Sequence, residues 1–197
     1  MDEHFVHPPH WEAYIVTYFF AAGLAGGCYV LATLLALTGY PEDRESARLG
    51  FLVPFPLVLL CALVLTLDLG RPWLFWHMLV NATPGAGGLN FKYWSPMSVG
   101  AWALLVFGIF SFVSFLGALP WARRPGPLDG TAGRVWMIAG TLLGLYIASY
   151  TGVLLSVSNQ PVWSDTWTLG GLFLASGLSG SAALLAWLVR RRAASGS

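Results

Sequence analysis

Five long apolar runs decide what this 197-residue chain can fold into. Each run is close to the roughly 20 residues that a helix needs to cross a bilayer. Apart from Arg134 at the edge of the fourth run, none of them contains Asp, Glu, Lys, Arg or His. Only 10% of the chain is charged, whereas a soluble domain has about 25%. We therefore expect an all-α integral membrane protein, a single membrane domain over residues 1–197 with about five spanning helices. These helices are predicted at residues 13–37, 49–67, 96–120, 134–158 and 167–189.

The segments that flank these runs differ in character. The first run follows an acidic, histidine-rich start without a basic region, so we expect a mature spanning helix rather than a cleaved signal peptide. Residues 41–48 predict a short charged loop, and Pro54 and Pro56 are expected to bend the second helix or delay its start. Residues 71–81 predict a short amphipathic helix at the membrane interface. Two GxxxG pairs, which let helices approach closely, are Gly23 with Gly27 and Gly140 with Gly144.

The basic residues are distributed unevenly between the two sides of the predicted bundle. The side with the N-terminus, the second-to-third loop and the fourth-to-fifth loop holds only Arg71 and Lys92. The opposite side holds Arg44, Arg48, Arg123, Arg124, Arg134, Arg190, Arg191 and Arg192. Because Lys and Arg concentrate in cytoplasmic loops, we expect the N-terminus outside and the C-terminus in the cytoplasm. The expected location is the cytoplasmic (inner) membrane of a bacterium or archaeon.

The stretch LTLDLGRPWLFW, from Leu65 to Trp76, joins the second run to the predicted interfacial helix. It places Asp68 and Arg71 three residues apart, within ion-pairing reach on one helical face or across one turn. Charges this close to hydrocarbon cost several kcal/mol unless they are paired. The pattern indicates either a functional pair at the membrane boundary or a helix end capped by an ion pair.

Residues that could take part in chemistry gather on the predicted outer side. An aromatic belt explains tryptophan at both interfaces, but it does not explain acids, histidines and long loops on one side only. We interpret the asymmetry as a binding surface or pocket at the outer membrane–water boundary. The alternative is that these residues are ordinary polar residues of the outer loops without a binding role. The residues are His10, Glu12, Asp68, Arg71, His77, Lys92, Trp94, Tyr150, Asn159, Trp163 and Asp165.

Several classes of site are disfavoured by what the chain lacks. Cys28 and Cys61 lie in apolar runs without a CxxC or CxxCH motif, which argues against zinc, attached haem or an iron–sulfur cluster held by this chain. No histidine lies in a helix core, so a bis-histidine haem is not expected. The net charge of +1 provides no footprint for nucleic acid. Tyr146 and Tyr150, one helical turn apart, could hold a ligand carbonyl or join a proton wire, or could bond only within the bundle.

Four motifs in order along the chain resemble the NrfD/polysulfide reductase C family. They are DLGRPWLFWHML (68–79), SPMSVGAW (95–102), YTGVLLSVSNQPVWSDTW (150–167) and FLASGLSGSAAL (173–184). The stretch GLAGGCYVLA also resembles that family's first helix, so the likeness covers nearly the whole chain. Typical members have eight or more spans. This chain therefore resembles a short member, or one whose missing helices come from another chain.

The resemblance implies a membrane subunit of a modular respiratory oxidoreductase complex, with terminal catalysis in partner subunits. Such subunits bind quinol or quinone, here expected to be menaquinol, near one membrane face. They exchange electrons with a [4Fe–4S] ferredoxin-like subunit, which connects to a molybdopterin enzyme, a hydrogenase or a multihaem cytochrome. His10 or Glu12, together with Tyr150, match the family's quinone contacts, and Asp68 and Arg71 lie in its DLGRP signature. With His77 these are the expected quinone-binding or proton-transfer residues, and the expected partner-facing residues are Lys92, Trp94, Asn159, Trp163 and Asp165.

Two other functions remain open at this point. A structural anchor would hold a redox complex on the membrane while another subunit binds quinone, and the short length favours it. A small transporter or channel subunit would show inverted repeats or helices broken at mid-membrane. Because no charge lies in a helix core, we expect no proton pumping by this chain alone.

Overall fold

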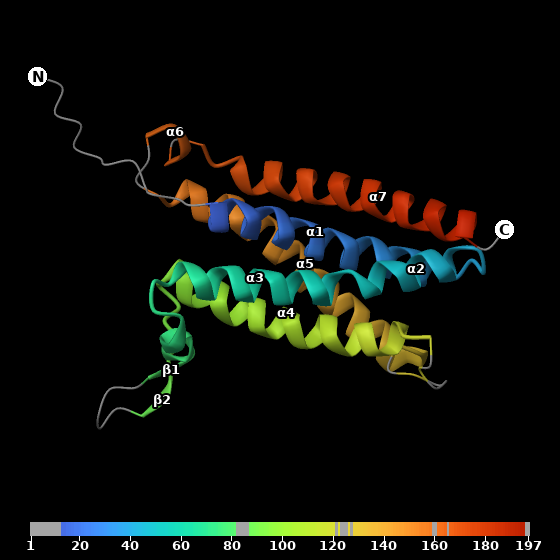
Figure 1. Cartoon of the computed structure of the whole chain (residues 1–197), viewed down its shortest axis with the longest axis horizontal. Helices are drawn as coiled ribbons and strands as arrows, with labels where there is room; N and C mark the ends of the chain where they lie inside the picture. Colours follow the sequence, from blue (N-terminus) through green and yellow to red (C-terminus); the bar gives the residue numbers. More distant parts are fainter. Residues whose placement is uncertain are drawn as a thin grey trace, which may run out of the picture.

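Helix α1 (Ala13–Thr38) packs against more of the bundle than any other element of the computed structural model (Figure 1). It contacts α2 (Asp43–Leu52), α3 (Pro54–Asp68), α5 (Gly130–Ser156) and α7 (Leu169–Ser195). The helices α4 (Pro96–Ala118) and α6 (Pro161–Ser164) complete the described set. The structure describes residues 13–81, 87–120, 122, 126, 128–158, 161–164 and 166–195.

Among the residues that the structure describes, five spans are long and apolar enough to cross a membrane. Four of them are the single helices α1, α4, α5 and α7, and the second span, Asp43–Asp68, consists of α2 and α3 end to end. The prediction of an all-α integral membrane protein with about five spanning helices is therefore confirmed. The expected effect of the prolines is visible as well, because α2 ends at Leu52 and α3 begins at Pro54.

Glycines let α1 approach its neighbours closely. A Cβ atom on Gly26 would overlap the carbonyl oxygen of Gly144 in α5. A Cβ atom on Gly27 would overlap the hydroxyl of Ser181 in α7, and that hydroxyl donates a hydrogen bond to the Leu24 carbonyl at 3.1 Å. Both predicted GxxxG pairs thus contain a glycine at a close helix contact, which is the role of small residues in membrane bundles.

Two predicted segments have a different structure. The predicted loop at 41–48 is helical from Asp43 onward. Its charged side chains bind other elements: Arg48 Nε donates to the Ala118 carbonyl at 2.6 Å, and Glu45 pairs with Arg192 at 2.9 Å. These long-range contacts stabilise the first turns of α2, and a local charge pattern does not reveal them.

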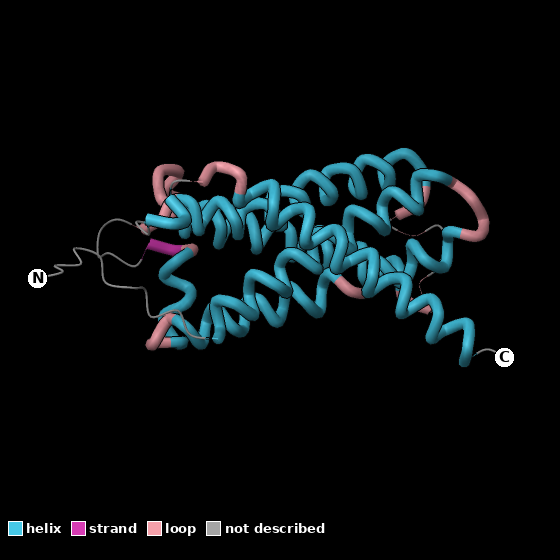
Figure 2. Tube along the Cα trace, turned by 90° about the horizontal axis from the view of Figure 1, so that it is seen from above, coloured by secondary structure: helices cyan, strands magenta, loops and turns pink. Residues whose placement is uncertain are grey.

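The predicted interfacial helix at 71–81 is a shorter 3-10 helix, η1 (Pro72–Met78). It is followed by an antiparallel pair of short strands, β1 (Val80–Asn81) and β2 (Gly88–Leu89). We call the end of the bundle that carries η1 and the strands the η1 end, and the end that carries Arg48 and Arg192 the arginine end. Figure 2 shows the strand pair at one end of the bundle and the C-terminal end of α7 at the other.

Candidate functional site

An apolar groove of about 620 Å³ lies between α1, α3 and α4 and reaches α5. Along α3 its lining runs from Phe55 to Asp68, which corresponds to about 20 Å at 1.5 Å per residue. Its described lining residues are Ile15, Tyr18, Phe19, Phe55, Val58, Leu59, Ala62, Leu65, Thr66, Asp68, Leu69, Phe75, Met78, Leu79, Met97, Gly100, Ala101, Leu104, Leu105, Gly108, Ile109, Phe112, Tyr150 and Leu154. We refer to this cavity as the apolar groove.

The polar side chains of the apolar groove are confined to its η1 end. Among the described lining residues they are Tyr18, Thr66, Asp68 and Tyr150. Asp68 is the last residue of α3, and Thr66 lies half a turn before it. Tyr18 and Tyr150 are only 3% and 6% exposed, so their rings lie deep between helices. The groove therefore combines a polar head region with a long apolar body.

Tyr150 is positioned by α4. Its hydroxyl donates a hydrogen bond of 2.5 Å to the carbonyl of Pro96, the first residue of that helix. One turn later, a Cβ atom on Gly100 would lie only 2.7 Å from Cε1 of the tyrosine ring. The ring can cross the start of α4 because residue 100 has no side chain.

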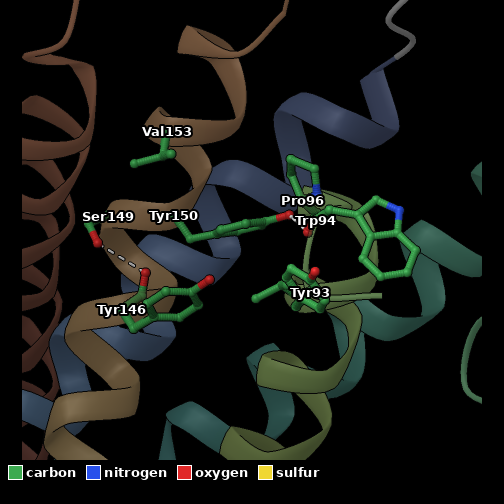
Figure 3. A pocket seen from close by; sticks show the side chains of 8 residues that line it. Tyr93, Trp94, Pro96, Tyr146, Ser149, Tyr150 and Val153 are labelled. Atoms are coloured by element: carbon green, nitrogen blue, oxygen red, sulfur yellow. Dashed lines mark hydrogen bonds between the residues drawn. The ribbon is translucent and has the colours of Figure 1, made fainter. Parts of the chain in front are cut away.

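A second cavity, of about 260 Å³, lies on another side of Tyr150 (Figure 3). Figure 3 shows the Tyr150 hydroxyl directed toward Pro96, with Tyr146 and Ser149 beside it on α5. The Tyr146 and Tyr150 rings are stacked with centroids 5.7 Å apart. Tyr150 lines both cavities, so its ring forms part of the wall between them.

The predicted site residues do not all meet in one place. Asp68 and Tyr150 line the apolar groove, and Trp94 lines the second cavity. His77 lines neither: its ring lies against Trp76, and its carbonyl accepts a hydrogen bond from Asn90 at 2.9 Å. Arg71, Lys92 and Trp163 also lie outside both linings, with Arg71 and Lys92 exposed and Trp163 half-buried. His10, Glu12, Asn159 and Asp165 lie outside the described residues.

The expected ion pair between Asp68 and Arg71 is absent from the described structure. Among residues 13–81 and the other described segments, acid–base contacts within 4.0 Å occur only at Glu45, with Arg48 and with Arg192. Gly70 adopts φ +67° between the two charges, a left-handed conformation that turns the chain out of the helix. Arg71 thus leaves the helical face on which Asp68 ends.

Among the lining residues that sequence reasoning missed, Tyr18, Thr66 and Gly100 contribute most to the polar end of the apolar groove. Tyr18 and Thr66 sit in uncharged runs, where a hydroxyl carries no directional signal. A role for Gly100 could have been predicted, because this residue lies one turn after the Ser-Pro start of a helix and inside the SPMSVGAW motif. A glycine at such a position indicates the close approach of another group.

Known proteins resemble this chain over almost its full length. The family model described as polysulphide reductase, NrfD matches residues 4–196. Protein NrfD of Escherichia coli K12 is 28% identical over 206 residues, which cover 92% of this chain and 61% of that protein. The NrfD homolog of Haemophilus influenzae is 27% identical over 193 residues, 88% of this chain and 57% of that protein.

A shorter likeness links the chain to a named reductase. The C subunit of the selenate reductase of Mesobacillus selenatarsenatis is 29% identical over 76 residues, 39% of this chain and 18% of that protein. The chain spans 61% of the length of the Escherichia coli relative and 57% of the Haemophilus influenzae one.

Proposed function

The chain belongs to the polysulphide reductase NrfD family, and from that premise we propose that it is a membrane subunit of a respiratory oxidoreductase complex. In this proposal the apolar groove binds a quinol or quinone, with menaquinol as the first candidate. The electrons pass to or from an iron–sulfur subunit that docks at the η1 end. The terminal reaction takes place in a further partner subunit.

The division of the apolar groove into a polar end and a long apolar body supports this proposal most strongly. A respiratory quinone has the same division, because a ring with two oxygens carries a long prenyl chain. The volume of about 620 Å³ lies within the roughly 300–1,000 Å³ of small-molecule sites. Tyr18 and Tyr150 would hold the ring. The apolar lining residues of α3 and α4, among them Val58 and Phe112, would hold the first part of the tail.

The exposed part of the groove lining supports entry of the ligand from the lipid. Leu59, Leu105 and Ile109 line the groove and are 53%, 41% and 52% exposed. An apolar surface this open within a spanning segment contacts hydrocarbon in a bilayer. A quinone dissolved in the membrane would reach the groove laterally, without crossing a polar layer.

The η1 end is the proposed docking surface for the redox partner. Large aromatic side chains are exposed there, with Trp73 88%, Tyr93 77% and Trp94 68% accessible. Tyr and Trp are enriched both in protein interfaces and in membrane-interface belts. Because the arginines concentrate at the other end, we place the η1 end and the partner outside the cytoplasm, following the positive-inside rule.

Photoaffinity labelling of the complex tests this proposal. The purified complex is illuminated with an azido-substituted naphthoquinone carrying a short prenyl tail, and labelled peptides are identified by mass spectrometry. We expect labels on α3, on the first half of α4 and near Tyr150, and protection by excess menadione. Labels that fall only on other subunits would contradict the proposal and favour the anchor function.

A further inference from the structure

Two of the three hydroxyl groups that line the apolar groove, those of Tyr150 and Thr66, already donate their hydrogen atoms to carbonyl groups of the protein. The Tyr150 hydroxyl donates to the Pro96 carbonyl at 2.5 Å. A carbonyl cannot donate, so the direction of this bond is fixed, and the phenolic oxygen retains only acceptor capacity. While this bond lasts, Tyr150 can accept a hydrogen bond from a ligand but cannot donate one.

Two other polar side chains at the same end, those of Thr66 and Asp68, also offer a ligand hydrogen-bond acceptors rather than donors. Thr66 donates its hydroxyl hydrogen to the Ala62 carbonyl at 2.7 Å, which leaves its oxygen as an acceptor. The carboxylate of Asp68 is an acceptor by nature. Tyr18 differs, because the described residues provide no hydrogen-bond partner for its hydroxyl, which can therefore donate or accept.

We infer that the apolar groove discriminates between the two redox states of its ligand and binds the hydroquinone more tightly than the quinone. A hydroquinone carries two O–H donors, which match the acceptors at Tyr150, Thr66 and Asp68. A quinone carries only acceptors and finds one side-chain donor among the described lining residues, at Tyr18. This inference rests on the proposed function, since it concerns the head group bound in the same groove.

The preference is expected to be about tenfold in dissociation constant, because one additional satisfied hydrogen bond contributes about that factor. Tighter binding of the reduced form also raises the midpoint potential of the bound couple. For a two-electron couple, a tenfold preference corresponds to about 30 mV. The groove would then favour capture of the reduced carrier and release of the oxidised one, while the bound hydroquinone would be a weaker electron donor by the same 30 mV or so.

The test measures binding of three naphthalene probes to the full chain in lipid nanodiscs under anaerobic conditions. Menadiol, kept reduced with dithionite, has two donors, and menadione has none. The redox-inert 1,4-dimethoxy-2-methylnaphthalene also has none and is measured with and without dithionite as a control for the reductant. The quantity compared is the ratio of the menadione and menadiol dissociation constants.

Variants separate the contributions of the polar groups. Tyr150→Phe and Thr66→Val each remove an acceptor and should lower the ratio about threefold or more. Asp68→Asn adds donors and should lower it as well. Tyr18→Phe removes the remaining side-chain donor and should raise the ratio. The matched controls are Tyr146→Phe and Thr17→Val. Of the two cavities, Tyr146 lines only the second, and the Thr17 hydroxyl, like that of Thr66, donates a hydrogen bond to the carbonyl four residues earlier.

Each outcome decides a different question. A ratio near ten that falls in Tyr150→Phe and Thr66→Val, but stays unchanged in the two controls, supports the inference. Equal affinities, a preference for menadione, or a ratio unaffected by all four groove variants would overturn it, while leaving the quinone site itself intact. Failure of menadiol and menadione alike to bind would overturn the proposed function together with the inference.

Discussion

Tyr150 connects α5 to α4 and lines both cavities. Its hydroxyl is bound to Pro96, its ring stacks on Tyr146, and its path across α4 is open because residue 100 is glycine. None of these contacts involves a charge, in keeping with a position inside a spanning segment. The position of the ring is therefore determined by shape and by one directed hydrogen bond.

Replacement of Gly100 by alanine should displace Tyr150. The added methyl group would meet the tyrosine ring and hydroxyl, and overpacking of this kind costs about 1–3 kcal/mol. We expect a lower thermal midpoint in detergent and weaker binding of menadione. Gly171→Ala is the matched control, since no atom lies within 4 Å of a Cβ at that position. Equal effects of the two substitutions would contradict the proposed role of Gly100.

The buried pair of Tyr29 and Ser114 links α1 to α4. Their hydroxyls are 2.8 Å apart, and both residues are fully buried. Ser114→Ala should lower the free energy of unfolding in mixed micelles by about 1 kcal/mol, since hydrogen bonds between membrane helices contribute about 0.6 kcal/mol on average and up to about 1.7. The exposed Ser179→Ala should have no measurable effect. A loss in Ser114→Ala no larger than that in Ser179→Ala would refute this assignment.

At the scale of elements, α1 is held by close contacts to α5 and α7. Gly26 lies against Gly144, and Gly23 and Gly27 lie against Gly177 and Ser181. Lipid tails are as apolar as leucine, so helices associate in membranes through tight packing rather than through a hydrophobic driving force. These contacts account for the central place of α1 in the bundle.

Gly26→Leu should therefore separate α1 from α5 and abolish assembly of a stable bundle. Size-exclusion chromatography of the detergent-solubilised chain should show aggregation in place of a single peak. Gly171→Leu places the same side chain on an open helix face and should give a wild-type profile. A single wild-type peak for Gly26→Leu would show that this contact is dispensable.

The sequence was sufficient to predict the spanning segments, but it was insufficient to predict which face of each helix lines the apolar groove. Hydropathy marks the five spans because each contains a long uncharged apolar stretch, and Pro54 marks the break in the second. The same uniformity conceals which side of α1 and of α3 lines the groove, so Tyr18 and Thr66 were not predicted as site residues. The helical turn at Asp43–Arg48 was missed because Ala118 and Arg192, which bind its side chains, are distant in sequence.

At the scale of the whole molecule, the two ends differ in chemistry. The arginine end holds the Glu45–Arg192 pair and a cation–π contact in which the Arg191 guanidinium lies 4.4 Å from the Trp187 ring centroid. The η1 end holds Asp68 and the exposed aromatic side chains. In the proposed orientation, the arginine end faces the cytoplasm and the aromatic η1 end faces the opposite side of the membrane.

Single cysteines should report this orientation. The native Cys28 and Cys61 are fully buried, so they are expected to react slowly. In intact spheroplasts, a membrane-impermeant maleimide should label Thr168→Cys at the η1 end within minutes. It should label Ala193→Cys, at the arginine end, only after permeabilisation. The reverse pattern would place the η1 end and its partner in the cytoplasm.

The quinone content of the purified complex tests the central claim most directly. The complex is isolated in mild detergent and extracted with organic solvent, and its quinone is quantified for the wild type, for Ala62→Phe, which fills the apolar groove, and for Ala182→Phe, which adds the same ring on the exposed face of α7. We predict close to one quinone per complex in the wild type and in Ala182→Phe, and a loss of at least about tenfold in Ala62→Phe. Unchanged quinone in an intact Ala62→Phe complex would contradict a quinone site in this groove.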